Sequence, residues 1–488
     1  MLRRAERSCL PAPTSKHPKH RVARPKGRAS TREEETLELV EETREEETKE
    51  HIEETREEET KEQVMNIVLL EPPSIYAFKG TFSINDFTSF LVCVVFNMMV
   101  RTTYHVEATE PLDKVATAIA AEQSTGTWTN VPAEKEVHEK VGARVVSAKD
   151  DTVVIDFPEE IFEPTNIPQI LSVVAGNLFG LGGLNALRLE DVDFDPLTKY
   201  YKGPVFGIQE VRKYLGVYDR PLVGTIIKPK VGLTPKRTAE VAEQAALGGL
   251  DLIKDDETLT DQAFCPMDER LPAVMEKLDK AKSVVGKPCL YACNITAGAD
   301  KIVERAERAK QLGANMIMVD VLTAGFSAIQ AINEANINLP IHVHRTMHGA
   351  LTRGKFGISM PVIAKLTRMV GGTNLHIGTY SGKMEHNFAD IDRSRDILRE
   401  PWAGYKPMFP AVSGGIYPQL LKANLDHYGI DCILQAGGGI HGHPEGTVAG
   451  AKAMFQAVEA WKENVKLEEY AKTHHELAVA LQKWGPSK

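Results

Sequence analysis

The sequence is poor in cysteine and lacks a long apolar run. Its six cysteines, among 488 residues, show no CxxC spacing, so neither a zinc site nor a disulfide framework is indicated, and a reducing compartment fits best. The longest apolar stretch, FLVCVVFNMMV at 90–100, is shorter than the about 20 residues that a membrane-spanning helix needs. We therefore expect a cytoplasmic protein without a membrane segment, in which residues 90–100 form a buried strand.

The sequence also lacks an excess of positive charge. Its net charge of -9 argues against a general nucleic-acid binder, because binding phosphate backbones requires a basic surface. Hydrophobic residues make up 42% and charged residues 26%, which is ordinary for a globular protein and names no function. The length allows two or three domains.

The first 65 residues differ from the rest. Residues 1–32 are basic, and the acidic element REEET then recurs at positions 32, 44 and 56, a period of 12. A 12-residue step rotates a helix by about 120°, so no apolar face forms, and we expect a solvated helix or a disordered extension over 1–65. A nuclear or nucleic-acid role for the basic block stays open. Translation could also begin later, at Met65, Met98 or Met99.

Globular patterning begins near residue 100. VRTTYHVEA (100–108) alternates like a strand, and LDKVATAIAAE (112–122) has helical apolar spacing. Residues 142–157 predict two strands around a Lys-Asp-Asp turn. These features indicate a small α+β domain over residues 66–205.

Beyond it, eight short apolar runs alternate with helical patterns. This rhythm predicts a parallel (β/α)₈ barrel over residues 206–470, followed by a C-terminal tail at 471–488. The runs are LVGTIIKPK (222–230), LDLIKDDE (250–257), LYACNIT (290–296), MIMVDV (316–321), IHVHR (341–345), LHIGT (375–379), FPAVSGG (409–415) and CILQAGGG (432–439).

The second run ends in one cation and three carboxylates, GGLDLIKDDE. Alternation places Lys254 on the opposite face from Asp255. Buried charges cost several kcal/mol each unless they are paired or bind a metal, although a solvated strand-to-helix turn would also explain them. The carboxylates of Asp256 and Glu257 are hard oxygen ligands that suit Mg²⁺ better than zinc.

Barrels place their chemistry at the carboxyl ends of their strands, and polar residues collect at these ends here. Glycines after the last two strands predict a phosphate site, and Arg345, His376 and Ser413 could hold a second phosphate. A metal, several lysines and two phosphate sites together indicate enolate or carbanion chemistry on a sugar bisphosphate. Structural roles remain possible for lone histidines, for the lysines that flank Pro229, and for Asn294 and Asp320. The strand-end residues, besides those of the second run, are Lys228, Lys230, Asn294, Asp320, His344, Arg345, His348, His376, Ser413, Gly414, Gly415, Gly437, Gly438 and Gly439.

The motifs closely resemble those of the large chain of ribulose-1,5-bisphosphate carboxylase/oxygenase (RuBisCO), in order, from about residue 100 to 465. They are AAEQSTGTWT, VVAGNLFG, GTIIKPKVGL, GGLDLIKDDE, HVHRTMH, HIGTYSGKME, AVSGGI and LQAGGGIHGHP.

This resemblance implies an activated lysine and a bound metal. Lys254 would react with a non-substrate CO₂ to give a carbamate (N6-carboxylysine), which with Asp256 and Glu257 makes a three-oxygen Mg²⁺ site. The carbamate would act as base toward C3 of ribulose bisphosphate. The Mg²⁺-bound enediolate would then add CO₂ to give two 3-phosphoglycerates, or O₂ in a side reaction.

The resemblance also assigns the other site residues. Lys228 would protonate the final carbanion, His344 would assist hydroxyl chemistry at C3, and Lys383 would stabilise the incoming carboxyl group from a mobile loop, paired with Glu122. Thr127, Trp128 and Asn177 would come from a neighbouring subunit, which requires at least a homodimer. The substrate-binding residues would be Glu122, Thr127, Trp128, Asn177, Lys230, Arg345, His376, Ser413, Gly415, Gly437 and Gly438.

Three departures from plant-type enzymes, Ile226, Met384 and His386, indicate similarity to the bacterial dimeric or archaeal forms rather than to the plant type, and of these we expect the archaeal type, form III. The resemblance then implies a homodimer or an assembly of dimers without a small subunit, serving nucleotide (AMP) ribose salvage. One alternative is a RuBisCO-like enolase or isomerase of a methylthio-sugar phosphate. Those relatives usually lack several of the residues Lys228, Lys383, Glu122 and Trp128, all of which are present here. Another alternative is a non-catalytic assembly protein that recruits partners through its repeats.

Overall fold

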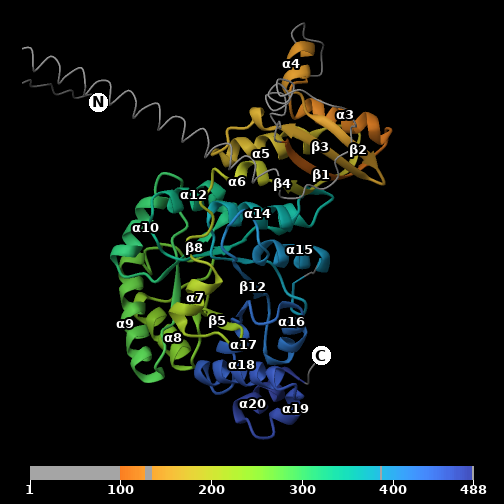
Figure 1. The fold of residues 1–488 in the computed structure, drawn as a ribbon. Helices are drawn as coiled ribbons and strands as arrows, with labels where there is room; N and C mark the ends of the chain where they lie inside the picture. The colour runs from red at the N-terminus through yellow and green to blue at the C-terminus, as the bar shows by residue number, and fades with distance from the viewer. Residues whose placement is uncertain (1–98, 127–133, 385–386, 486–488) are drawn as a thin grey trace, which may run out of the picture. The chain divides into compact units, whose positions relative to one another are not determined.

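The computed structural model describes residues 99–126, 134–384 and 387–485, which contain a five-stranded mixed sheet and a closed barrel of eight parallel strands (Figure 1). The predicted fold class, a small α+β domain followed by a (β/α)₈ barrel, is confirmed. The charged extension and most of the strand expected at 90–100 lie outside the described residues. Within the described part of the chain, no helix combines the length and apolar character that crossing a membrane requires.

The small sheet has the strand order β10-β4-β1-β3-β2. Strand β1 pairs antiparallel with both β3 and β4, and its alternate residues Val100, Tyr104 and Val106 are fully buried. The turn between β2 and β3 has positive φ at Asp150 and Asp151, as a type I′ hairpin turn requires. The elements of this part are β1 (Met99–Ala108), α3 (Leu112–Glu122), α4 (Glu134–Val141), β2 (Arg144–Lys149), β3 (Thr152–Pro158), η1 (Glu159–Ile161), α5 (Ile167–Ala175), η2 (Asn177–Gly180), β4 (Leu184–Asp193) and α6 (Asp195–Thr198).

All eight apolar runs form barrel strands, in the closed order β11-β12-β13-β5-β6-β7-β8-β9. Most strand residues are buried, because helices cover the outside of the barrel and side chains fill its inside. The strands are β5 (Leu222–Ile226), β6 (Leu252–Lys254), β7 (Leu290–Asn294), β8 (Met316–Asp320), β9 (Ile341–His344), β11 (Asn374–His376), β12 (Phe409–Ser413) and β13 (Ile433–Gln435).

Helices surround this barrel. The longest is α9, and it packs against α8, which has several buried alanines. The helical elements are α7 (Ile208–Leu215), α8 (Pro235–Leu247), α9 (Met267–Val285), α10 (Ile302–Gln311), α11 (Val321–Ala324), α12 (Phe326–Glu334), α13 (Gly349–Thr352), α14 (Met360–Val370), α15 (Phe388–Arg399), η3 (Pro418–Leu420), α16 (Leu421–Tyr428), α17 (Gly438–His441), α18 (Thr447–Lys462), α19 (Leu467–Tyr470) and α20 (His475–Trp484).

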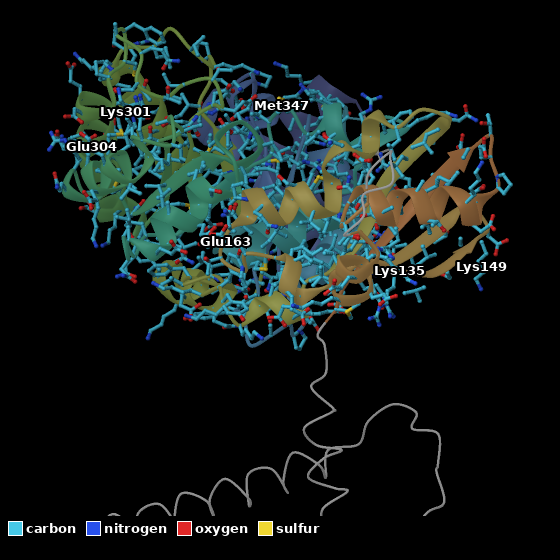
Figure 2. The ribbon with its side chains drawn as sticks, turned by 90° about the horizontal axis from the view of Figure 1, so that it is seen from above. Lys135, Lys149, Glu163, Lys301, Glu304 and Met347 are labelled. Atoms are coloured by element: carbon cyan, nitrogen blue, oxygen red, sulfur yellow. The ribbon has the colours of Figure 1, made fainter. Side chains whose placement is uncertain are left out.

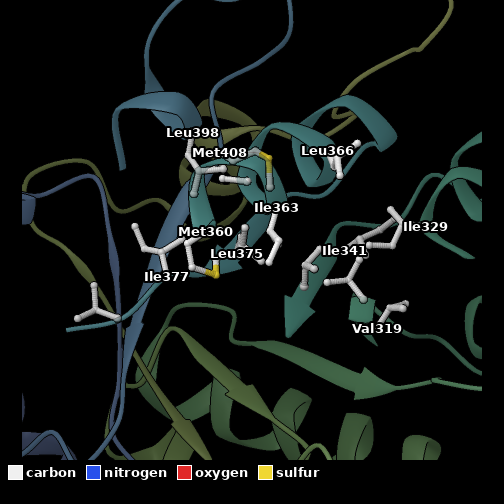
Figure 3. Close-up of a cluster of buried hydrophobic side chains, with 14 of the residues drawn as sticks. Val319, Ile329, Ile341, Met360, Ile363, Leu366, Leu375, Ile377, Leu398 and Met408 are labelled. Atoms are coloured by element: carbon white, nitrogen blue, oxygen red, sulfur yellow. The ribbon is translucent and has the colours of Figure 1, made fainter. Parts of the chain in front are cut away.

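Two apolar layers pack against the barrel strands. Inside, Ile208 and Leu215 of α7 join Leu222, Leu252 and Phe409 in one cluster, which closes the amino-terminal end. Outside, the alternate strand residues pack against the helices. Figure 3 shows such a group, in which side chains of β8, β9 and β11 lie beside those of α12 and α14. The opposite, carboxyl-terminal end of the barrel is therefore the end left free for polar chemistry.

Two segments of the barrel region form contacts beyond the predicted pattern. Strand β10 (Phe356–Ile358) pairs parallel with β4 and so joins the small sheet. The expected C-terminal tail includes α20, which packs on α18 because Leu477 and Ala480 are apolar and buried. Charged residues such as Lys149 and Glu304 are exposed at the surface, as Figure 2 shows.

Candidate active site

A cavity of about 670 Å³ lies at the carboxyl ends of the barrel strands. Every barrel strand except β7 and β8 contributes to its lining directly or through the loop that follows it. The lining residues are Ile226, Lys228, Lys230, Lys254, Asp256, Glu257, His344, Arg345, Thr346, Met347, His348, His376, Lys383, Met384, Ser413, Gly414, Gly415, Ile416, Tyr417, Gln435, Gly437, Gly438, Gly439 and Trp484. Strand-end residues from distant parts of the sequence thus share one cavity.

Lys254 is the last residue of β6, and its side chain is 1% exposed. Its Nζ atom donates a 2.7 Å hydrogen bond to the backbone carbonyl of Asp255. Burial lowers the pKa of Lys254, although the neighbouring carboxylates of Glu257 and Asp256 oppose this shift. A lysine in this setting is neutral more often than a surface lysine, and a neutral amine is a nucleophile.

Asp256 and Glu257 follow Lys254 and face lysines of the neighbouring strand end. Lys228 Nζ donates to Asp256 Oδ2 at 2.9 Å, and Lys230 Nζ lies 3.6 Å from Glu257 Oε1. Burial would raise the pKa of Asp256, but the hydrogen bond and charge of Lys228 outweigh it, and the pKa is lowered. Two ionised carboxylates therefore border the cavity.

A buried network holds the backbone that carries these groups. Asp255 points away from the cavity, and its Oδ1 accepts a hydrogen bond from Tyr291 Oη at 2.5 Å. Its Oδ2 accepts from the backbone N–H of Asn294 at 2.9 Å and lies 3.2 Å from Arg270 Nη2. Asn294 Nδ2 in turn donates to the carbonyls of Asp256 and Glu257. These contacts fix the end of β6, and so the positions of its charged side chains.

His344 stands opposite the carboxylates at the end of β9. Its Nε2 atom lies 3.8 Å from Glu257 Oε2, and its Nδ1 atom lies 3.0 Å from Asp320 Oδ1. Burial lowers the pKa of His344, although Asp320 opposes the shift. A largely neutral imidazole at this position can accept or donate a proton.

The other side of the cavity combines glycines with the lysine of the loop after β11. Lys383 donates its backbone N–H to the carbonyl of Gly414 at 2.8 Å. A Cβ atom on Gly415 would come within 2.8 Å of the Lys383 side chain, and one on Gly437 within 3.0 Å of Lys228 Cε. Glycine at both positions lets the lysine stems approach the backbone closely.

Four of the site residues that the resemblance assigns lie elsewhere or are not described. Glu122 ends α3 and Asn177 begins η2, and neither belongs to the cavity lining of the described chain. Thr127 and Trp128 lie outside the described residues.

Several lining residues were not predicted from the sequence. Gln435 is the inward residue that ends β13, so strand alternation could have found it. Trp484 reaches the cavity from α20 and stacks on Tyr417 at 5.9 Å between ring centroids. No local pattern signals that contact. Met347, which is labelled in Figure 2, is 53% exposed and borders the cavity.

Comparisons with known proteins all identify the same family. The model of the ribulose bisphosphate carboxylase large chain, catalytic domain, matches residues 207–484, and the model of its N-terminal domain matches residues 94–197. The ribulose bisphosphate carboxylase of Methanosarcina mazei is 42% identical over 405 residues, which is 78% of this chain and 95% of that protein.

Solved structures give the same result. The octameric ribulose-1,5-bisphosphate carboxylase/oxygenase of Pyrococcus horikoshii superposes with a TM-score of 0.74 at 36% identity, covering 79% of this chain and 93% of that one. The dimeric archaeal Rubisco of Hyperthermus butylicus gives 0.73 at 38% identity, covering 80% and 96%. A rubisco-like protein from Burkholderia fungorum gives 0.71 at 28% identity, covering 79% and 99%.

Proposed function

This chain belongs to the ribulose bisphosphate carboxylase large-chain family and is an enzyme of its archaeal type, and we propose that it converts ribulose 1,5-bisphosphate and CO₂ into two molecules of 3-phosphoglycerate. The observation that carries the proposal is the single cavity that combines Asp256, Glu257, four lysines and two glycine loops. These residues together could bind a metal, stabilise an enolate and bind two phosphates.

The first proposed step is activation of Lys254. Its lowered pKa favours the neutral amine, whose Nζ attacks CO₂. A bond forms between nitrogen and carbon, one N–H proton leaves, and a carbamate anion results. The described chain has no group of three His, Cys, Asp or Glu side chains placed to hold a metal, so Asp256 and Glu257 need a further oxygen ligand. A carbamate supplies it, and this all-oxygen set fits Mg²⁺. When bound, Mg²⁺ stabilises negative charge on the substrate oxygens.

The remaining steps use the side chains around this centre. The carbamate removes the proton at C3, and C2 of the resulting enediolate bonds to CO₂, or to O₂ in the oxygenase side reaction. After CO₂ has been added, water adds at C3, the C2–C3 bond breaks, and Lys228 protonates the carbanion that is left at C2. His344 assists the hydroxyl chemistry at C3, and Lys383 faces the incoming carboxyl group. Closure of the loop that carries Lys383 excludes water.

The two substrate phosphates bind at opposite sides of the cavity. Backbone N–H groups at Gly415, Gly437 and Gly438 receive one phosphate. Arg345 receives the other beside His376, while Ser413 and Lys230 contact the sugar portion. Burial lowers the pKa of Arg345 to about 10, so its guanidinium remains charged at neutral pH and attracts an anion.

We propose that the cavity is completed in a homodimer or an assembly of dimers, without a small subunit. Glu122, Thr127, Trp128 and Asn177 would come from the second copy, which accounts for the absence of Glu122 and Asn177 from the lining within the described chain. The related structures named above include a dimer and an octamer. The test is to mix two inactive variants, Lys254→Ala and Asn177→Ala. Shared sites predict recovered activity, and no recovery after proven subunit exchange would contradict the arrangement.

The second candidate function is that of a RuBisCO-like enolase or isomerase, because the similar structures include a rubisco-like protein from Burkholderia fungorum. The products distinguish the two reactions. A carboxylase splits each bisphosphate into two 3-phosphoglycerates, one of them labelled by ¹⁴CO₂. An isomerase would return one product from a methylthio-sugar phosphate and fix no CO₂. We also propose a role in nucleotide-ribose salvage, supported by the archaeal origin of the named relatives. Cell extracts depleted of this chain should then stop forming 3-phosphoglycerate from AMP.

A further inference from the structure

His342 lies beneath the cavity and has no place in the mechanism above. It is the second residue of β9, is 0% exposed, and does not line the cavity. Its side chain points to the barrel interior, like that of His344 two residues later. The role that we infer for this buried imidazole concerns binding of the proposed substrate, so it rests on the proposed function.

Hydrogen bonds connect His342 to the cavity. Its Nε2 atom lies 2.9 Å from Nε2 of His376, and Nδ1 of His376 lies 2.7 Å from Oγ of Ser413. Both His376 and Ser413 line the cavity. The three side chains thus form one continuous chain from the barrel interior to the substrate space, and both ring nitrogens of His376 are engaged within it.

The direction of one hydrogen bond determines the direction of the other. Burial lowers the pKa of His342 and of His376 well below the ordinary value, so each ring carries one N–H at neutral pH. If His342 donates from Nε2, then His376 accepts there and must donate from Nδ1 to Ser413. If His376 donates from Nε2 instead, its Nδ1 must accept the hydroxyl proton of Ser413. The tautomer of His342 therefore decides what Ser413 presents to the cavity.

The ring nitrogen of His342 that lies farthest from Ser413 along this hydrogen-bond chain favours the first direction. Nδ1 of His342 has no hydrogen-bond partner among the described residues. Under the first direction this atom is a bare acceptor, whereas under the second it is an N–H group. Buried N–H groups without partners are rarer than buried acceptors without full pairing. A sugar bisphosphate, moreover, presents mainly acceptor oxygens, which a donating hydroxyl can bind.

We propose that His342 is a positioning residue that, by donating through His376, turns the hydroxyl proton of Ser413 into the cavity as a hydrogen-bond donor for an oxygen of the substrate. Aligned donors along such a chain polarise one another, which strengthens the last bond. His342 acts only through His376, so it touches neither the substrate nor the reacting atoms.

The tautomers can be measured directly. In protein labelled with ¹⁵N in its histidine rings, the spectrum separates protonated from bare ring nitrogens, and the variants His342→Leu and His376→Gln assign the two rings by difference. We expect a protonated Nδ1 in His376 and a protonated Nε2 in His342. A protonated Nε2 in His376 would overturn the proposal. This measurement needs no turnover, so its result is independent of whether the chain fixes CO₂.

Kinetics test the consequence for the substrate. The His342→Leu variant removes the donor at similar volume, and we expect KM for ribulose 1,5-bisphosphate to rise about tenfold with a smaller change in kcat, the effect of losing one hydrogen bond. His342→Gln places an amide donor near the Nε2 position and should keep KM within about twofold of the wild type.

The matched control is Thr102→Val, which removes a buried hydrogen bond to the carbonyl of Ile155 in the small sheet and should leave KM unchanged. An unchanged KM in a folded His342→Leu variant, or an equal rise in the His342→Gln variant, would contradict the positioning role. If His342→Leu does not fold, the wild-type spectrum and the KM of the His342→Gln variant still test the positioning role.

Discussion

Lys228 and Asp256 connect the ends of two neighbouring barrel strands, β5 and β6, through a 2.9 Å hydrogen bond from Nζ to Oδ2. Asp256 is 1% exposed, so this contact keeps a buried carboxylate ionised. The same carboxylate is the proposed Mg²⁺ ligand. One residue pair thus joins the proposed acid of the last step to the proposed metal site.

Loss of that carboxylate should weaken metal binding. In the Asp256→Asn variant we expect the affinity for Mg²⁺, measured by calorimetry after equilibration with CO₂, to fall at least about tenfold, because a neutral amide is a weaker ligand for a hard cation. Asp268→Asn is the control, since Asp268 is an exposed residue of α9 that pairs with Arg308. Equal affinity in the Asp256→Asn and wild-type proteins would place the metal elsewhere.

The pair of Arg270 and Asp255 should matter for stability. Both side chains are fully buried, and removing the cation leaves an uncompensated carboxylate. We expect Arg270→Met to lower the free energy of unfolding by about 3–5 kcal/mol, with partial recovery in the double variant that adds Asp255→Asn. Arg308→Met, which breaks the exposed pair with Asp268, should cost less than about 1 kcal/mol. Urea denaturation provides both numbers, and equal losses would contradict the buried network.

Two partly buried histidines predict how stability depends on pH. Burial lowers the pKa of His441 to about 4 and that of His348 to about 3, whereas an unfolded histidine titrates near about 6.5. Below that value the unfolded chain binds more protons, so stability falls as the pH drops from 7 to 5. Most carboxylates titrate lower and contribute little in this window.

Urea midpoints at pH 7 and pH 5 measure the effect. The difference between the two pH values should shrink in His441→Gln, which removes one of the titrating groups, and should stay unchanged in Asn464→Gln, an exposed site after α18. A wild-type midpoint that does not change from pH 7 to pH 5 would show that these histidines are not held neutral.

The charged extension should be dispensable for catalysis. A 12-residue repeat would give a helix no continuous apolar face, and the family models begin to match only at residue 94. We propose domain limits of 1–65, 66–205, 206–470 and 471–488. A variant without residues 1–64 should therefore retain kcat within about twofold of the full chain. A loss of kcat greater than about tenfold in the folded, dimeric variant would assign the extension a structural role.

Much of this fold could be predicted because barrel strands are buried on both faces. The eight apolar runs therefore stand out, and alternation in GGLDLIKDDE placed Lys254 and Asp255 on opposite faces. The structure shows that Lys254 faces the cavity and Asp255 faces Arg270 of α9. Strand β10 could not be predicted, because three residues carry too little periodicity and its partner β4 is far away in sequence. The roles of Asp255, Arg270 and His342 depend on contacts between strands and helices. A single histidine in an apolar run gives no sign of its hydrogen-bond partner.

Fixation of ¹⁴CO₂ into acid-stable 3-phosphoglycerate is the measurement that tests the central claim most directly. Purified protein would be equilibrated with CO₂ and Mg²⁺ without oxygen and then given ribulose 1,5-bisphosphate, with the wild type compared with Lys254→Ala and Lys383→Ala. We predict fixation by the wild type, and at least about a hundredfold less in each variant. No fixation by folded wild-type protein that binds Mg²⁺ would contradict the carboxylase assignment and favour the enolase or isomerase.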